Sequence, residues 1–258
     1  MPQLLDLPPE ILQIIMHELV IFDITDAWVL QSVCRTFAAE ISYAFGRLRQ
    51  TEIMSQDSEI LGIHWLYLYY RAKVLLDAKP EVPARVNKMV EWLSEKTGVK
   101  EGDEQTREQY TKALCKALVQ NVSFYTFKEW MGFRELSYSS RAELDNWTKA
   151  PLCLSEKIGA VAVIGHDKLL SELLEKCKSI LHGNGTFGHP LSNAATSGHI
   201  NIINVLSNYA DEYGLTESAS RPEIVPSSIR MKAIEDALSL RDVNVVACLL
   251  YTSPSPRD

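Results

Sequence analysis

Several features that would point to an enzyme, a metal centre or a membrane protein are missing from this sequence. No apolar run reaches the length of a membrane span, about 18 residues, and the first ten residues lack the basic start of a secretory signal. The five cysteines form no C-x-x-C pair, and the six histidines show no H-E-x-x-H spacing. We therefore expect no metal, no cofactor and no catalytic residue. We also expect an intracellular location, in the cytoplasm, the nucleus or both.

Positive charge is also scarce. The chain has 26 Lys and Arg against 33 Asp and Glu, a net charge of −7, and no long basic run. Because phosphate contacts need clustered cations, this balance argues against a broad nucleic-acid-binding face and against an anionic membrane surface. The hydrophobic fraction of 46% is too high for wholesale disorder. The composition is therefore that of an ordinary globular protein.

Residues 1–47 predict three short helices. Pro8 and Pro9 followed by Glu10 favour a helix start, because proline fits the first turn and an acid complements the helix dipole. Thr25 or Asp26 can cap a second helix, and apolar residues at a spacing of four mark a third. So short a segment rarely buries all its apolar surface alone. Either the rest of the chain or a partner is expected to cover the excess.

The amino-acid sequence of this segment resembles an F-box. The resemblance rests on LLDLPPEIL, on the acid Asp26, and on VCRTF from Val33 to Phe37, with Ala27 and Phe37 as departures from the family pattern. It implies docking on the adaptor subunit of a cullin-RING ubiquitin ligase. By that resemblance the adaptor-binding candidates are Leu7, Pro8, Ile11, Leu12, Ile15, Leu30 and Val33. The alternative is a three-helix cap packed on its own chain.

A repeat follows in the carboxy-terminal third. KIGAVAVIGHDKLLSELL, from Lys157, aligns with PLSNAATSGHINIINVLS, from Pro190, at an offset of 33 residues. That period is typical of ankyrin repeats, and PLSNAATSGH resembles the first ankyrin helix and its turn. The structural positions implied are Ala162, Gly165, His166, Ala195, Gly198 and His199. A degenerate third copy lies in AIEDALSLRDVNVVACLL, where Ala237 and Val245 take equivalent places and Arg241 and Asp242 replace the Gly-His pair.

The last eleven residues, CLLYTSPSPRD, differ abruptly in style from the helical pattern before them. Back-translated, they resemble the end adapter of transposase-made sequencing libraries. We therefore expect residues 248–258 to be a technical fusion and the natural chain to continue beyond Ala247.

The middle of the chain, residues 48–150, is expected to be helical. Two amphipathic helices are predicted there, one around Val86 and Leu93 and one around Leu114 and Leu118. Aromatic residues gather at 124–138 and are interpreted as core or as a recognition surface. A G-x-G-x-x-G match at 183–188 follows an apparent helix, which argues against a dinucleotide site and favours a loop.

These observations predict an all-α protein in four parts. They are an F-box-like unit at 1–47, a helical connecting region at 48–150, ankyrin repeats forming a solenoid at 151–247, and the adapter-derived tail at 248–258. The predicted function is a non-catalytic substrate receptor of an SCF-type ubiquitin ligase, which binds the ligase adaptor and an unknown protein target. The alternative is an ankyrin-repeat scaffold with no ligase link.

Overall fold

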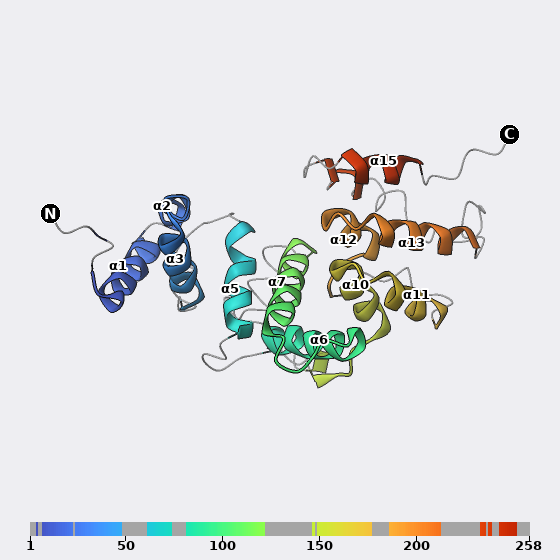
Figure 1. The fold of residues 1–258 in the computed structure, drawn as a ribbon, viewed down its shortest axis with the longest axis horizontal. Coiled ribbons are helices and arrows are strands. Elements are labelled where there is room, and N and C mark those ends of the chain that lie inside the picture. The colour runs from blue at the N-terminus through green and yellow to red at the C-terminus, as the bar shows by residue number, and fades with distance from the viewer. Residues whose placement is uncertain are drawn as a thin grey trace. The chain divides into compact units, whose positions relative to one another are not determined.

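The computed structural model describes residues 4, 7–22, 24–47, 61–73, 81–121, 146–147, 149–176, 186–212, 233–235, 237–238 and 243–251 (Figure 1). Within these ranges every regular element is a helix and no strand occurs, which confirms the all-α prediction. The chain divides into two compact units, Met1–Lys88 with Val122–Ala150, and Met89–Asn121 with Pro151–Asp258. The predicted connecting region 48–150 is therefore shared between both units.

In the first unit, the three helices expected within residues 1–47 are present. They are α1 (Pro9–Phe22), α2 (Ile24–Leu30) and α3 (Arg35–Arg47). Helix α1 packs against α2 and α3, and α3 also packs against α5 (Leu61–Lys73). The shared core of α1–α3 contains Leu12, Met16, Val20, Ala27, Ile41 and Ala44.

Helix α5 was not predicted individually, and most of its circumference is buried. Tyr67 and Tyr69 are both buried, and each phenol oxygen accepts a hydrogen bond from a cation four residues later. Arg71 Nε donates to Tyr67 at 3.1 Å, and Lys73 Nζ donates to Tyr69 at 3.4 Å. The two cations lie in the last turn, where they also complement the negative end of the helix dipole.

Helix α6 (Glu81–Thr97) begins in the first unit with a fully buried arginine. Arg85 donates to the carbonyl oxygen of Ala150, and its guanidinium carbon lies 5.3 Å from the centre of the Trp147 ring. Lys88 Nζ donates to the same carbonyl at 3.0 Å. A buried cation needs such partners, so these contacts fix residues 146–150 against α6.

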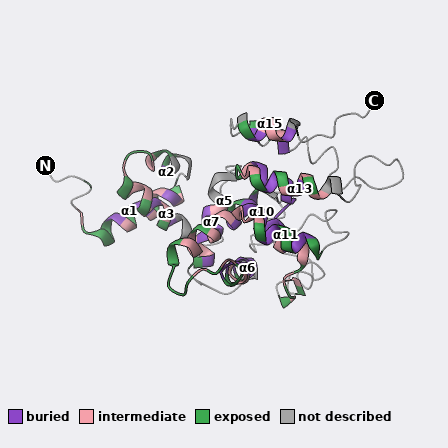
Figure 2. Cartoon of the chain, turned by 45° about the vertical axis from the view of Figure 1, so that its right-hand side comes forward, coloured by how far each residue is buried: buried purple, intermediate pink, exposed green. Residues whose placement is uncertain are grey.

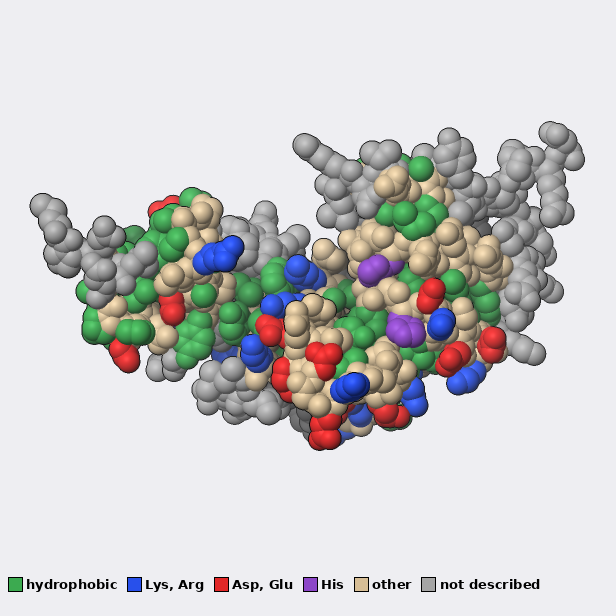
Figure 3. Space-filling model, in the orientation of Figure 1, with side chains coloured by type: hydrophobic (Ala, Val, Ile, Leu, Met, Phe, Trp, Pro, Cys, Tyr) green, Lys and Arg blue, Asp and Glu red, His purple; other side chains and the backbone are tan. Residues whose placement is uncertain are grey.

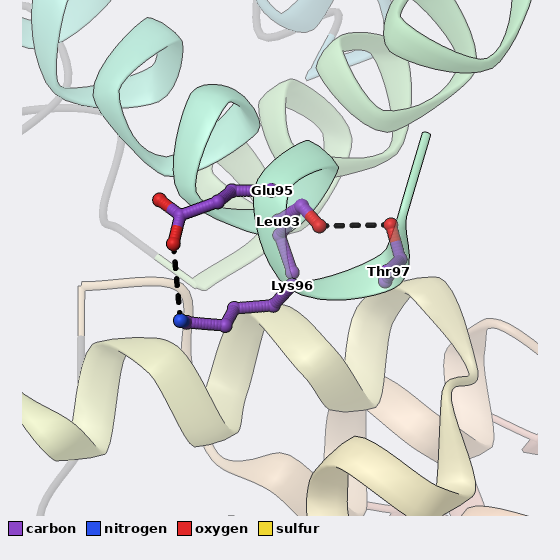
Figure 4. Close-up of polar contacts among 4 residues, drawn as sticks. All are labelled: Leu93, Glu95, Lys96 and Thr97. Carbon is purple, nitrogen blue, oxygen red and sulfur yellow. Dashed lines mark hydrogen bonds and ion pairs between the residues drawn. The ribbon is translucent and has the colours of Figure 1, made fainter. Parts of the chain in front are cut away.

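The end of α6 lies in the second unit, where hydrogen bonds to its last carbonyl groups terminate the helix. Thr97 Oγ1 donates to the Leu93 carbonyl at 2.8 Å, and Lys96 pairs with Glu95 at 3.1 Å on the exposed side (Figure 4). Gly98 has φ +70°, and Val99 N donates to the Ser94 carbonyl at 3.0 Å. The left-handed Gly98 and the hydrogen bond from Val99 N back to the Ser94 carbonyl, five residues earlier, together terminate the helix.

The rest of the second unit consists of α7 (Glu104–Asn121) and successive helix pairs. The first pair is α10 (Leu154–Ile164) with α11 (Asp167–Glu175), and the second is α12 (Pro190–Thr196) with α13 (Ile200–Glu212). The corresponding helices of the two pairs pack on each other: the first helices, α10 and α12, are in contact, and so are the second helices, α11 and α13. Helix α7 packs on α10 at one end of this array, and α15 (Val243–Tyr251) packs on α13 at the other (Figure 1).

Candidate functional site

Helix α1 has two apolar faces. Leu12, Met16 and Val20 are buried against the neighbouring helices, whereas Ile11 and Ile14 expose 44% and 59% of their surface. At 3.6 residues per turn, the exposed residues lie on the side of the helix opposite the buried ones. Buried and exposed positions alternate along α1 accordingly (Figure 2). Within the part of the chain that the structure describes, the buried residues of α1 therefore lie on one side of the helix.

The turn between α2 and α3 presents more apolar surface. Val29 and Val33 are exposed by 62% and 61%. Ser32 Oγ donates to the Val29 carbonyl at 2.7 Å, and Val33 N donates to the Leu30 carbonyl at 3.1 Å. These local bonds fix the turn that carries the exposed valine.

We call Ile11, Ile14, Ile15, Val29 and Val33 the α1–α2 apolar surface. Figure 3 shows hydrophobic side chains on the visible face of the α1–α3 segment. Isolated exposed hydrophobic residues are ordinary, but several on α1, α2 and the turn after α2 make this segment the candidate binding surface.

The predicted adaptor-binding residues divide into three groups. Pro8, Ile11, Ile15 and Val33 are exposed, and Leu7 and Leu30 are half-buried. Leu12 differs, because it is 5% exposed and belongs to the core of the α1–α3 segment. Leu12 therefore contributes to the core of this segment, and its contact with the adaptor stays a prediction. Ile14 and Val29, which are also exposed, were not among the candidates, because the candidates were taken from the F-box resemblance and not from exposure.

Cys34 has a structural role at the start of α3. Its Sγ accepts a hydrogen bond from Phe37 N at 3.5 Å, and its carbonyl accepts from Ala38 N at 3.0 Å. These contacts satisfy two backbone donors of the first turn, as a helix cap does.

The repeated Gly-His pairs lie at the turns between paired helices, at their 33-residue spacing. Gly165 and Gly198 have φ of +77° and +72°, the left-handed conformation that favours glycine. The alanines of both repeats, Ala162 and Ala195, are fully buried. All six predicted structural positions therefore lie in or directly beside the two helix turns.

The two histidines occupy equivalent positions but make different contacts. His166 Nδ1 accepts from Leu169 N at 3.2 Å and caps α11. His199 Nε2 lies 3.0 Å from the Val163 carbonyl, so a proton on that nitrogen is donated across to the preceding helix pair. A Cβ built on Gly165 would come within 2.7 Å of the His199 ring. Glycine is thus required there both for its backbone angle and for space.

Buried polar side chains link the two helix pairs further. Asn193 is 1% exposed, and its Nδ2 donates to the Gly159 carbonyl at 3.2 Å and to the Phe187 carbonyl. The carboxylate of Glu156, 2% exposed, accepts from Cys153 N at 3.0 Å and from Thr186 Oγ1 at 2.9 Å. Sequence reasoning missed both residues, because their partners lie on another helix or loop.

The third copy follows the pattern in part. Ala237, Val245 and Leu249 are buried, and Val246 is half-buried. Arg241 and Asp242 lie outside the described residues, as do the aromatic stretch 124–138 and residues 183–185 of the glycine-rich loop. Of that loop, Phe187 is fully buried and Gly188 has φ +87° just before α12 begins.

Chemically reactive groupings were sought in the same described ranges. Those ranges contain no cluster of three or more His, Cys, Asp or Glu able to hold a metal ion. None of their helices has both the length and the apolar character to cross a membrane. Burial raises the pKa of the Cys115 and Cys248 thiols, which disfavours the reactive thiolate at both.

Comparison with known proteins gives no relative. No family model, no curated protein and no solved structure matches the chain.

Proposed function

We propose that this chain is a substrate-receptor subunit of a cullin-RING (SCF-type) ubiquitin ligase. In this proposal the amino-terminal helices dock on the ligase adaptor, and the helix-pair array, as ankyrin repeats, binds a protein target. The observation that supports it most is the α1–α2 apolar surface, which includes three of the residues that the F-box resemblance implies as contacts: Ile11, Ile15 and Val33.

Burial of this surface by a partner must release enough free energy to offset the cost of association. Full burial of one Ile or Val side chain contributes about 1.5–3 kcal/mol, and these side chains are already partly covered, so each has less to gain. Association costs about 4–15 kcal/mol in lost freedom of motion. Several anchors must therefore act together, and the half-buried Leu7 and Leu30 are available beside the exposed residues.

The helix-pair array supports the second half of the proposal. Its 33-residue period, its glycine turns and the packing of like helices on like are the features expected of ankyrin repeats. Such arrays present an extended recognition surface. Catalysis would lie with the recruited conjugating enzyme, and this chain would contribute proximity between that enzyme and the target.

Binding of the purified adaptor to the full chain tests the proposal. We expect the wild-type chain to bind, and Ile11→Asp and Val33→Asp each to abolish binding while the thermal melt stays unchanged. Ala84→Asp is the matched control, because Ala84 is an exposed residue of α6 in the same unit. It should bind as the wild type does.

A folded wild-type chain that fails to bind the adaptor would exclude the ligase link and leave the scaffold alternative. Equal binding by the wild type and by Ile11→Asp would exclude the α1–α2 apolar surface as the docking site.

A further inference from the structure

We draw no further inference here: the strongest candidate, the exposed apolar side of α1 that ends at Phe22, continues the α1–α2 apolar surface already described, and nothing in the part of the chain that the structure describes shows what covers it.

Discussion

The imidazole of His199 lies 3.0 Å from the carbonyl oxygen of Val163, 36 residues earlier, and fills the space beside Gly165. One side chain thereby closes the turn of the preceding helix pair and links the two pairs. The glycine and the histidine depend on each other, because any side chain at 165 would collide with the ring.

Gly165→Ala should destabilise the protein more than Gly98→Ala. Both glycines have positive φ, but nothing lies within 4 Å of a Cβ on Gly98, whereas His199 lies at 2.7 Å from one on Gly165. We expect about 1 kcal/mol for the backbone term at either site, and at least about 1 kcal/mol more at Gly165 for the collision. Urea unfolding of the intact chain measures both. Equal losses would show that the histidine ring yields without cost.

Asn193→Ala should cost about 1–3 kcal/mol, because it removes the buried Nδ2 group that donates to the carbonyls of Gly159 and Phe187. Asn193→Asp should cost more, since a carboxylate would face two carbonyl oxygens. Asn201→Ala, on the exposed side of α13, is the control and should change stability by no more than about 0.5 kcal/mol. A thermal melt that does not distinguish Asn193→Ala from Asn201→Ala contradicts the linking role of Asn193.

Neighbouring substitutions on α1 should destabilise the protein to very different extents. Leu12→Ala removes a buried side chain and should lower the free energy of unfolding by about 2–5 kcal/mol. Ile11→Ala removes one that is 44% exposed and should lower it by no more than about 1 kcal/mol. Chemical unfolding of both variants checks this. Similar losses would place Ile11 in the core and remove it from the proposed docking surface.

Asp103 should make stability depend on pH in the acid range. Thr106 donates to its carboxylate from both backbone N and hydroxyl, at 3.1 and 2.8 Å, and these bonds hold the pKa of Asp103 below its ordinary value of 3.8. The charged form is favoured in the folded state, so its contribution is present above pH 3.8 and is lost as the pH falls through the lowered value.

Asp103→Asn is the test, because asparagine can still cap α7 but does not ionise. The unfolding free energy of this variant should fall below that of the wild type near neutral pH, and the two should converge in acid. Glu104→Gln, one residue later and in the first turn of the same helix, controls for the general effect of removing an acid. A difference between Asp103→Asn and wild type that is constant with pH contradicts the role of the Asp103 charge.

The glycine turns show what a single sequence reveals well. A left-handed turn favours glycine, so the turns at Gly165 and Gly198 could be predicted from the 33-residue spacing of these two residues in the sequence. The contacts of His166 and His199 could not be separated in this way. His166 contacts Leu169 N of its own helix pair, whereas His199 contacts the Val163 carbonyl of the preceding pair, and the shared Gly-His motif does not indicate this difference.

Helices α1 and α5 mark the limit of pattern reasoning. Periodicity identifies a buried face only by contrast with a polar one, and α1 is apolar on both sides. Neither the burial of Leu12 nor the exposure of Ile14 could be predicted from such a pattern. In α5, cations and phenols that pair with one another lie among buried residues, so its pattern predicted no exposed side.

Whether residues 248–258 derive from a sequencing adapter depends on the transcript sequence, and the adapter interpretation stays a prediction. Helix α15 runs across Ala247 to Tyr251, and Leu249 is buried, so the printed residues are compatible with a helix there whatever their source. A transcript read across the codon for Ala247 tests it. Direct continuation into Cys248 and the printed end would refute the adapter interpretation.

The contacts around Glu156 and Asn193 have a practical consequence. Thr186 and Phe187 are bonded to α10 and α12, so the segment between Lys176 and Thr186 starts and finishes at fixed points on the array. Because the entropy of closing a loop grows only slowly with its length, foreign sequence inserted there should add little strain. An affinity tag inserted between Lys176 and Thr186 should therefore leave the packing of α10 on α12 and of α11 on α13 unchanged.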